Sequence, residues 1–168
     1  IMYTNNKVGN VIYKVIEYFG DDVRRINHFL KVYGYVKLIG ECENLDDSMQ
    51  EILEVTAVLH DVGIKVAEQK YNSSAGHYQQ LEGPPVAKKI LDELGYPDDF
   101  VERVMYLIAH HHTYTNIDGM DYQILVEADF LVNADEDRLS SDAIENFKEK
   151  IFKTTTGIAV LENNYLNL

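Results

Sequence analysis

Apolar residues recur at helical spacing along almost the whole chain. Val11, Val15 and Phe19 mark one face of a first helix, and Gly20 ends it. A second helix, over about residues 23–40, has apolar side chains on most of its sides, which is typical of a central, buried helix. A third apolar helix begins after residues 45–48 and runs into the pair His60-Asp61.

The second half of the chain shows the same helical period after one interruption. Residues 65–80 have little periodicity, and we expect a long loop there. Further helices are predicted over residues 83–94, 99–108, 124–132, 143–152 and 158–166. No pair of strands, repeat or linker is apparent, so we expect one all-α domain over residues 1–168. Its chemistry lies within about residues 22–135, and residues 140–168 add C-terminal helices.

Composition narrows the classes of partner and the compartment. The chain has 15 basic and 28 acidic residues, and its net charge of −13 opposes binding to nucleic-acid polymers and to anionic membranes. A single cysteine, Cys42, excludes an intrachain disulfide, and no apolar run reaches the length of a membrane span. We therefore expect a cytoplasmic protein whose metal ligands, if it has any, are His, Asp and Glu.

Four predicted helices share one unusual feature, a metal-competent side chain within or at the end of an apolar segment. These side chains are His28, the pair His60-Asp61, the cluster at 110–112, and Asp129. Helical proteins build metal sites from ligands that face a common core from different helices. The alternative is that each group is satisfied separately by its own hydrogen bonds, as most buried polar groups are.

The same residues carry a resemblance to a known family. The order His28, then His60-Asp61, then Asp129 resembles the H…HD…D pattern of the HD superfamily of metal-dependent phosphohydrolases. Five segments of this chain resemble the family text in the same order: Arg25-Ile26-Asn27-His28, Leu59-His60-Asp61-Val62-Gly63, Leu81-Glu82-Gly83-Pro84-Pro85-Val86-Ala87, Ile108-Ala109-His110-His111-His112 and Glu127-Ala128-Asp129. The resemblance implies a single helical HD-type domain with its metal site between core helices.

By this resemblance, four side chains bind one divalent metal ion, namely His28, His60, Asp61 and Asp129. Two imidazoles and two carboxylates suit Mn, Fe, Co, Ni, Zn or Mg. Dinuclear relatives have a further histidine where this chain has Gln79, which argues against a second ion.

The resemblance also implies a reaction and roles for individual residues. A bound divalent ion lowers the pKa of its water from 15.7 towards about 7, which provides a hydroxide nucleophile. We expect Asp61 to contact both metal and water, His111 to act as an acid, base or phosphate donor, and Lys65 and Arg25 to bind phosphate. Against these roles, His111 could merely cap its helix, Lys65 could be an ordinary surface lysine, and Arg25 could pair with Asp21 or Asp22.

Three functions follow as hypotheses. The first is a metal-dependent phosphohydrolase that acts on a small phosphorylated metabolite or nucleotide. The second is a catalytically silent, metal-containing ligand-binding or regulatory domain, and the third is a dinuclear iron oxygenase or lyase. Tyr78, Tyr114 and Tyr122 could stack on a base or belong to the core.

The last predicted helix suggests a homodimer. Its apolar side chains exceed what a terminal helix needs for its own packing: Ile158, Val160, Leu161, Tyr165 and Leu166.

Overall fold

The structure is a computed structural model and describes residues 7–167. In this part of the chain nine α-helices are followed by a short π-helical turn, and there is no β-strand: α1 (Val8–Phe19), α2 (Val23–Cys42), α3 (Asp47–Leu59), α4 (Ile64–Tyr71), α5 (Gly76–Glu93), α6 (Asp98–His110), α7 (Met120–Glu136), α8 (Ser141–Ile151), α9 (Thr155–Leu161) and η1 (Glu162–Leu166). The all-α prediction is therefore confirmed. None of the described helices combines the length and the apolar character that a membrane span requires.

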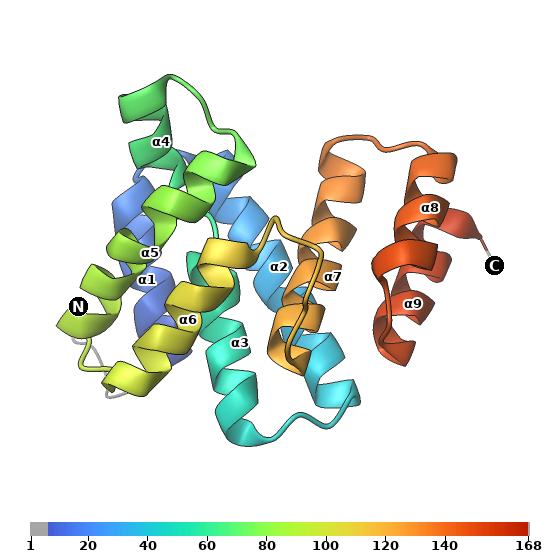
Figure 1. The fold of residues 1–168 in the computed structure, drawn as a ribbon, viewed down its shortest axis with the longest axis horizontal. Helices are drawn as coiled ribbons and strands as arrows, with labels where there is room; N and C mark the ends of the chain where they lie inside the picture. The colour runs from blue at the N-terminus through green and yellow to red at the C-terminus, as the bar shows by residue number, and fades with distance from the viewer. Residues whose placement is uncertain (1–6, 168) are drawn as a thin grey trace.

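The helices pack in two groups that meet at α2 and α3. On one side α1 and α6 pack against α3 and α5 packs against α6, and on the other side α7 lies along α2 and carries α8 and α9 (Figure 1). Each group has its own cluster of buried apolar side chains, one around Leu53, Leu125 and Leu161 and the other around Val15 and Leu59. Because α3 contributes to both clusters, the end of α3 lies at the junction of the two groups.

The long loop predicted over residues 65–80 is wrong. Helix α4 occupies most of it and ends at Asn72, whose φ of 51° places it in the left-handed region that Asn tolerates. Helix α5 begins at Gly76, so Pro84 and Pro85 lie inside this helix and not at its start. The periodicity was weak because α4 is a single short helix that exposes most of its side chains to solvent.

The apolar C-terminal segment packs within the chain. Leu161 is fully buried, and Ile158, Val160, Tyr165 and Leu166 pack against the cluster around Leu53 and Leu125. The apolar excess that suggested a homodimer therefore has an intramolecular explanation, and the dimer stays a prediction without that support.

Candidate metal centre

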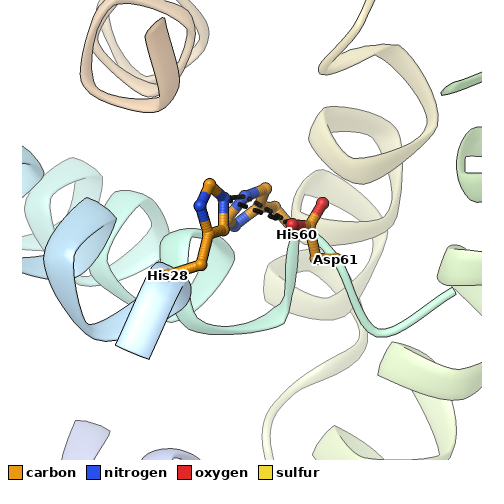
Figure 2. Close-up of side chains that lie close together, drawn as sticks. All are labelled: His28, His60 and Asp61. Atoms are coloured by element: carbon orange, nitrogen blue, oxygen red, sulfur yellow. Dashed lines mark hydrogen bonds and ion pairs between the residues drawn. The ribbon is translucent and has the colours of Figure 1, made fainter. Parts of the chain in front are cut away.

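Four side chains from three segments converge on one point at the junction of the two helix groups. His28 comes from α2, His60 and Asp61 follow directly at the end of α3, and Asp129 comes from the middle of α7. Nε2 of His28 lies 3.2 Å from Nε2 of His60, 3.2 Å from Oδ2 of Asp61 and 3.1 Å from Oδ1 of Asp129. Nε2 of His60 lies 3.4 Å and 3.3 Å from the same two carboxylate oxygens. Figure 2 shows the two imidazoles and the Asp61 carboxylate turned toward one another.

The chain turns sharply after the His-Asp pair, and a glycine makes this turn fit. A Cβ atom on Gly63 would lie 2.6 Å from the backbone N of Gly83 and 2.7 Å from the carbonyl O of Gln79. The turn therefore packs backbone to backbone against α5. Only a residue without a side chain allows this approach, which fixes the direction in which Asp61 leaves α3.

Hydrogen bonds at the other ring nitrogen fix the tautomer of the histidines. Nδ1 of His60 donates to the Ala57 carbonyl at 2.6 Å, and Nδ1 of His28 contacts Oε1 of Glu136 at 2.5 Å. Because a carbonyl or carboxylate oxygen accepts the proton at Nδ1, Nε2 of a neutral ring keeps a free lone pair. The two Nε2 atoms face each other here at 3.2 Å, and a proton or a metal ion between them satisfies both.

The electrostatics of the cluster also favour a positive charge. Burial opposes protonation of His28, but the hydrogen bond to Asp129 and the charges of Asp61 and Asp129 outweigh burial and raise its pKa to about 9. The pKa of His60 is raised as well, because the same carboxylates outweigh its burial. Burial would raise the pKa of the two carboxyls, yet the adjacent histidines hold the pKa of each below its ordinary value.

These four residues fit a divalent metal ion. Ligand atoms about 2.1 Å from a metal are separated by roughly 3.0 to 3.4 Å in octahedral or tetrahedral geometry. The separations of 3.1 to 3.4 Å in the cluster lie in this range. His28, His60 and Asp61 offer ligand atoms within 4.8 Å of one another that could hold a metal ion, and Oδ1 of Asp129 lies 3.1 and 3.3 Å from the two imidazoles. Two imidazole nitrogens and two carboxylate oxygens are a common ligand set for a divalent transition metal.

His111 lies beside the cluster with an unused nitrogen. Its Nδ1 donates to the Ile108 carbonyl at 2.6 Å, so this ring does contact the end of its own helix. Its Nε2 is buried without a hydrogen-bond partner among the described residues and lies 3.5 Å from Oδ1 of Asp61. The helix-terminal contact therefore occupies one nitrogen and leaves the other facing Asp61.

The neighbouring His112 gives a second group of metal-competent atoms. Asp61, His111 and His112 offer atoms that all lie within 4.8 Å of one another. Nε2 of His112 contacts the amide oxygen of Gln79 at 2.8 Å. Burial and the adjacent His111 lower the pKa of His112 to about 4, so this ring is neutral near pH 7 and donates this hydrogen bond.

A polar cleft of about 680 Å³ opens above the cluster, and Arg25 lines it whereas Lys65 does not. Arg25 lines the cleft, but its guanidinium is bound to Asp22 at 3.1 Å and to Glu68, which is the ion-pair alternative. Lys65 lies outside the cleft, where its Nζ donates to the Tyr18 carbonyl at 3.1 Å. This position gives the expected phosphate contact of Lys65 no support, and the contact stays a prediction.

The tyrosines considered for base stacking also lie outside the cleft. Tyr78 stacks on Tyr71 with ring centroids 4.0 Å apart, and Tyr114 meets Phe147 edge-on. Tyr122 is buried and donates to a backbone carbonyl. These rings belong to packing contacts of the fold.

Sequence reasoning missed two residues of this site. Glu136 lies seven residues after Asp129 on the same face of α7 and holds Nδ1 of His28. The spacing of two helical turns is a signal that could have found it. Arg24 lines the cleft, and no hydrogen bond or ion pair of its side chain occurs within residues 7–167. It precedes the paired Arg25, and only the structure distinguishes the two.

Comparison with known proteins supports this reading of the fold. The crystal structure of a predicted HD superfamily hydrolase from an uncultured Thermotogales bacterium is 23% identical, with a TM-score of 0.65, and the match covers 95% of this chain and 84% of that one. A search of curated proteins found no match. The family model of the HD domain matches residues 25–145, a span that contains His28, the His60-Asp61 pair and Asp129. Because that span is more than half of the sequence, this chain belongs to the HD domain family.

Proposed function

We propose that this protein is a metal-dependent phosphohydrolase that acts on a small phosphate ester. The observation that carries the proposal is that Nε2 of His28 and Nε2 of His60 each lie 3.1 to 3.4 Å from a carboxylate oxygen of Asp61 and of Asp129, below an open cleft of about 680 Å³. Membership of the HD domain family and the likeness to a predicted HD superfamily hydrolase support a hydrolase. The acidic surface of the chain fits a reaction in which a bound cation attracts the anionic substrate.

His28, His60, Asp61 and Asp129 would hold the metal ion. When bound, a divalent ion supplies Lewis-acid activation of a water molecule and of a phosphoryl oxygen. The two oxygens of Asp61 face different partners: Oδ2 faces the two metal-competent imidazoles, and Oδ1 faces His111. Asp61 is therefore suited to bind the ion with one oxygen and to accept a proton with the other.

His111 is suited to hold a proton next to Asp61. The Ile108 carbonyl fixes its ring through Nδ1, and Nε2 has no other hydrogen-bond partner in the described chain. General acid-base catalysis needs a group of this kind within reach of the reacting atoms. We assign to His111 the exchange of a proton on the Asp61 side of the site.

Metal content and hydrolysis, measured together, test the proposal. Wild type and Asp129→Ala are purified without chelator, analysed for metal per chain, and assayed on p-nitrophenyl phosphate with each metal added back. The matched control is Asp135→Ala, an exposed carboxylate on the same helix α7. We expect about one ion per chain and hydrolysis in wild type and the control, and neither in Asp129→Ala.

Other outcomes separate the alternatives. Bound metal without hydrolysis of any ester would favour the silent ligand-binding domain, and two ions that include iron would favour the oxygenase. Wild-type protein without metal under every condition would overturn the proposal. Circular dichroism of each variant shows whether it is folded.

A further inference from the structure

The cleft above the metal centre offers almost nothing on which a flat apolar ring could stack. Ile64 is the one aliphatic residue that lines it, and no Phe or Tyr lines it in the described part of the chain. The ring of His112 is occupied, because it packs against Gly76 and its Nε2 is bound to Gln79. A nucleobase would leave water here without gaining a stacking partner.

Four polar side chains on the walls of the cleft are accessible to a ligand, since Arg24, Ser74 and Asp137 are exposed and Asn133 is half-buried. Arg24, Ser74, Asn133 and Asp137 line the cleft, and across residues 7–167 their side chains make no hydrogen bond or ion pair. They offer a guanidinium, a hydroxyl, an amide and a carboxylate, which together provide donors and acceptors. Hydroxyl groups, which both donate and accept, are the ligand groups that such a mixed set satisfies.

The charges in the cleft leave room for one phosphate group. Arg24 is the cleft cation without an ion-pair partner among the described residues, since Arg25 is bound to Asp22 and Glu68. Asp137 places a carboxylate on the same cleft, and the chain carries a net charge of −13. A second phosphate group would meet these carboxylates without a cation to balance it.

We propose that the substrate is a phosphate monoester of a small polyhydroxylated carrier, of the sugar-phosphate or polyol-phosphate type, and not a nucleotide. This inference rests on the proposed hydrolase function. Arg24 would bind the phosphate together with the metal site. Asn133, Ser74 and Asp137 would bind the hydroxyls of the carrier.

Ribose 5-phosphate and AMP form a matched pair of probes, since AMP carries the same phosphate ester plus a base. The metal-loaded wild type is assayed on both, and p-nitrophenyl phosphate reports hydrolysis independently of the carrier. Binding of the two probes is measured by calorimetry on metal-loaded His111→Gln, in which we expect turnover to be slow. We expect ribose 5-phosphate to exceed AMP by about tenfold or more in kcat/KM and in affinity.

Variants test the residues that carry the inference. Asn133→Ala should lower kcat/KM for ribose 5-phosphate about five- to tenfold, and lower it less for p-nitrophenyl phosphate, which has no hydroxyl to bind. Arg24→Met should raise KM for every phosphate ester. The control is Lys88→Met, which removes a cation from the exposed face of α5, where Lys88 pairs with Asp92.

The experiments distinguish a wrong substrate class from a wrong proposal that the protein is a hydrolase. If AMP is hydrolysed or bound as well as ribose 5-phosphate, the sugar-phosphate inference is overturned while the hydrolase stands. If no ester is hydrolysed but ribose 5-phosphate binds tenfold more tightly than AMP, the hydrolase fails, and only the preference of the cleft for a sugar phosphate as a ligand stands. An Asn133→Ala protein that is folded and processes ribose 5-phosphate like wild type would also overturn it.

Discussion

At the scale of single residues, the candidate metal centre depends on groups that are not metal ligands themselves but hold the ligand side chains in place. Nδ1 of His28 is held by Glu136, and Nδ1 of His60 is held by the Ala57 carbonyl. A hydrogen bond at this position orients the ring and makes Nε2 a better ligand. Glu136 is the partner that a substitution can remove, because the Ala57 contact uses the backbone.

We predict that Glu136→Gln weakens metal binding about tenfold, because an amide is a weaker acceptor for the His28 ring than a carboxylate. Metal affinity is measured by competition with a chromophoric chelator. The control is Lys31→Met, which removes the other partner of Glu136, 3.2 Å away, and leaves the His28 contact. Equal affinity in Glu136→Gln and wild type would show that Glu136 does not orient the ligand.

The sequence predicted the four converging residues better than it predicted their surroundings. His28, His60, Asp61 and Asp129 stand out because polar groups interrupt apolar helices. Lys65 carries no such signal. The direction in which the Lys65 side chain points depends on its position around helix α4. Because the sequence predicted a loop in place of α4, this direction could not be predicted. The assignment of the four residues as metal ligands stays a prediction until metal content is measured.

At the scale of elements, the turn between α3 and α4 is the most constrained contact near the centre. A Cβ atom on Gly63 would meet backbone atoms of α5 at 2.6 and 2.7 Å, and backbone atoms cannot rotate away as a side chain can. The site therefore depends on a backbone contact between this turn and α5, and the polar residues of the sequence give no sign of it.

We predict that Gly63→Ala destabilises the fold by about 1 to 3 kcal/mol through this overlap. Gly34→Ala is the matched control, since nothing lies within 4 Å of a Cβ atom on Gly34 in helix α2. There alanine should stabilise by about 0.5 to 1 kcal/mol, because it restricts the unfolded chain. Urea unfolding of both variants measures the difference, and a stable Gly63→Ala would contradict the close contact.

A second element contact joins the C-terminal helices to the rest of the molecule. The fully buried carboxylate of Glu127 on α7 accepts hydrogen bonds from Gln123, from the backbone N–H groups of Lys153 and Thr154, and from the Thr154 hydroxyl. Thr154 in turn caps α9. One side chain thus fixes where α8 ends and α9 begins.

We predict that Glu127→Gln costs about 2 to 3 kcal/mol, because its amide N–H₂ would face donors that need an acceptor. Glu149→Gln, on the exposed surface of α8, is the control and should change stability by less than about 0.5 kcal/mol. Chemical denaturation compares the two. Equal midpoints would show that Glu127 does not hold these helices.

Helical periodicity predicted most elements, and it failed where local chemistry replaces it. The amphipathic helices α1 and α6 and the buried helix α7 gave clear patterns. Helix α2 lies centrally but is buried on one face only, because Leu30 and Leu38 are exposed. Helix α4 is short and exposed, and the two prolines of α5 suggested a helix start where the helix continues. Helix boundaries of this kind depend on tertiary packing, and the hydrophobic pattern of a single sequence does not predict them.

At the scale of the whole molecule, one ion-pair group ties α6 to the segment that leads into α7. Arg103 binds Asp118 at 2.9 Å and Asp121 at 2.8 Å. Hydrogen bonding and attraction to Arg103 lower the pKa of Asp118 below its ordinary 3.8. Asp118 is largely exposed, so solvent screens much of this contribution.

The lowered pKa gives a definite sign for stability against pH. The unfolded chain protonates Asp118 before the folded chain does, so the contribution is present above about pH 4 and is lost as pH falls below it. We predict that Arg103→Met is less stable than wild type at pH 6 and that the gap narrows between pH 4 and pH 3. Thermal unfolding across this range measures the gap, and a constant gap would exclude the linkage.

The position of the centre at the junction of the two helix groups has a consequence for the unfolding of the molecule. Its four side chains span residues 28 to 129 of the chain and come from three separate segments, so neither hydrophobic cluster alone contains a complete set. An ion bound there would crosslink the two halves, because its ligands come from both of them. Separation of the halves would disperse these ligands, so a bound ion would add to the free energy of unfolding.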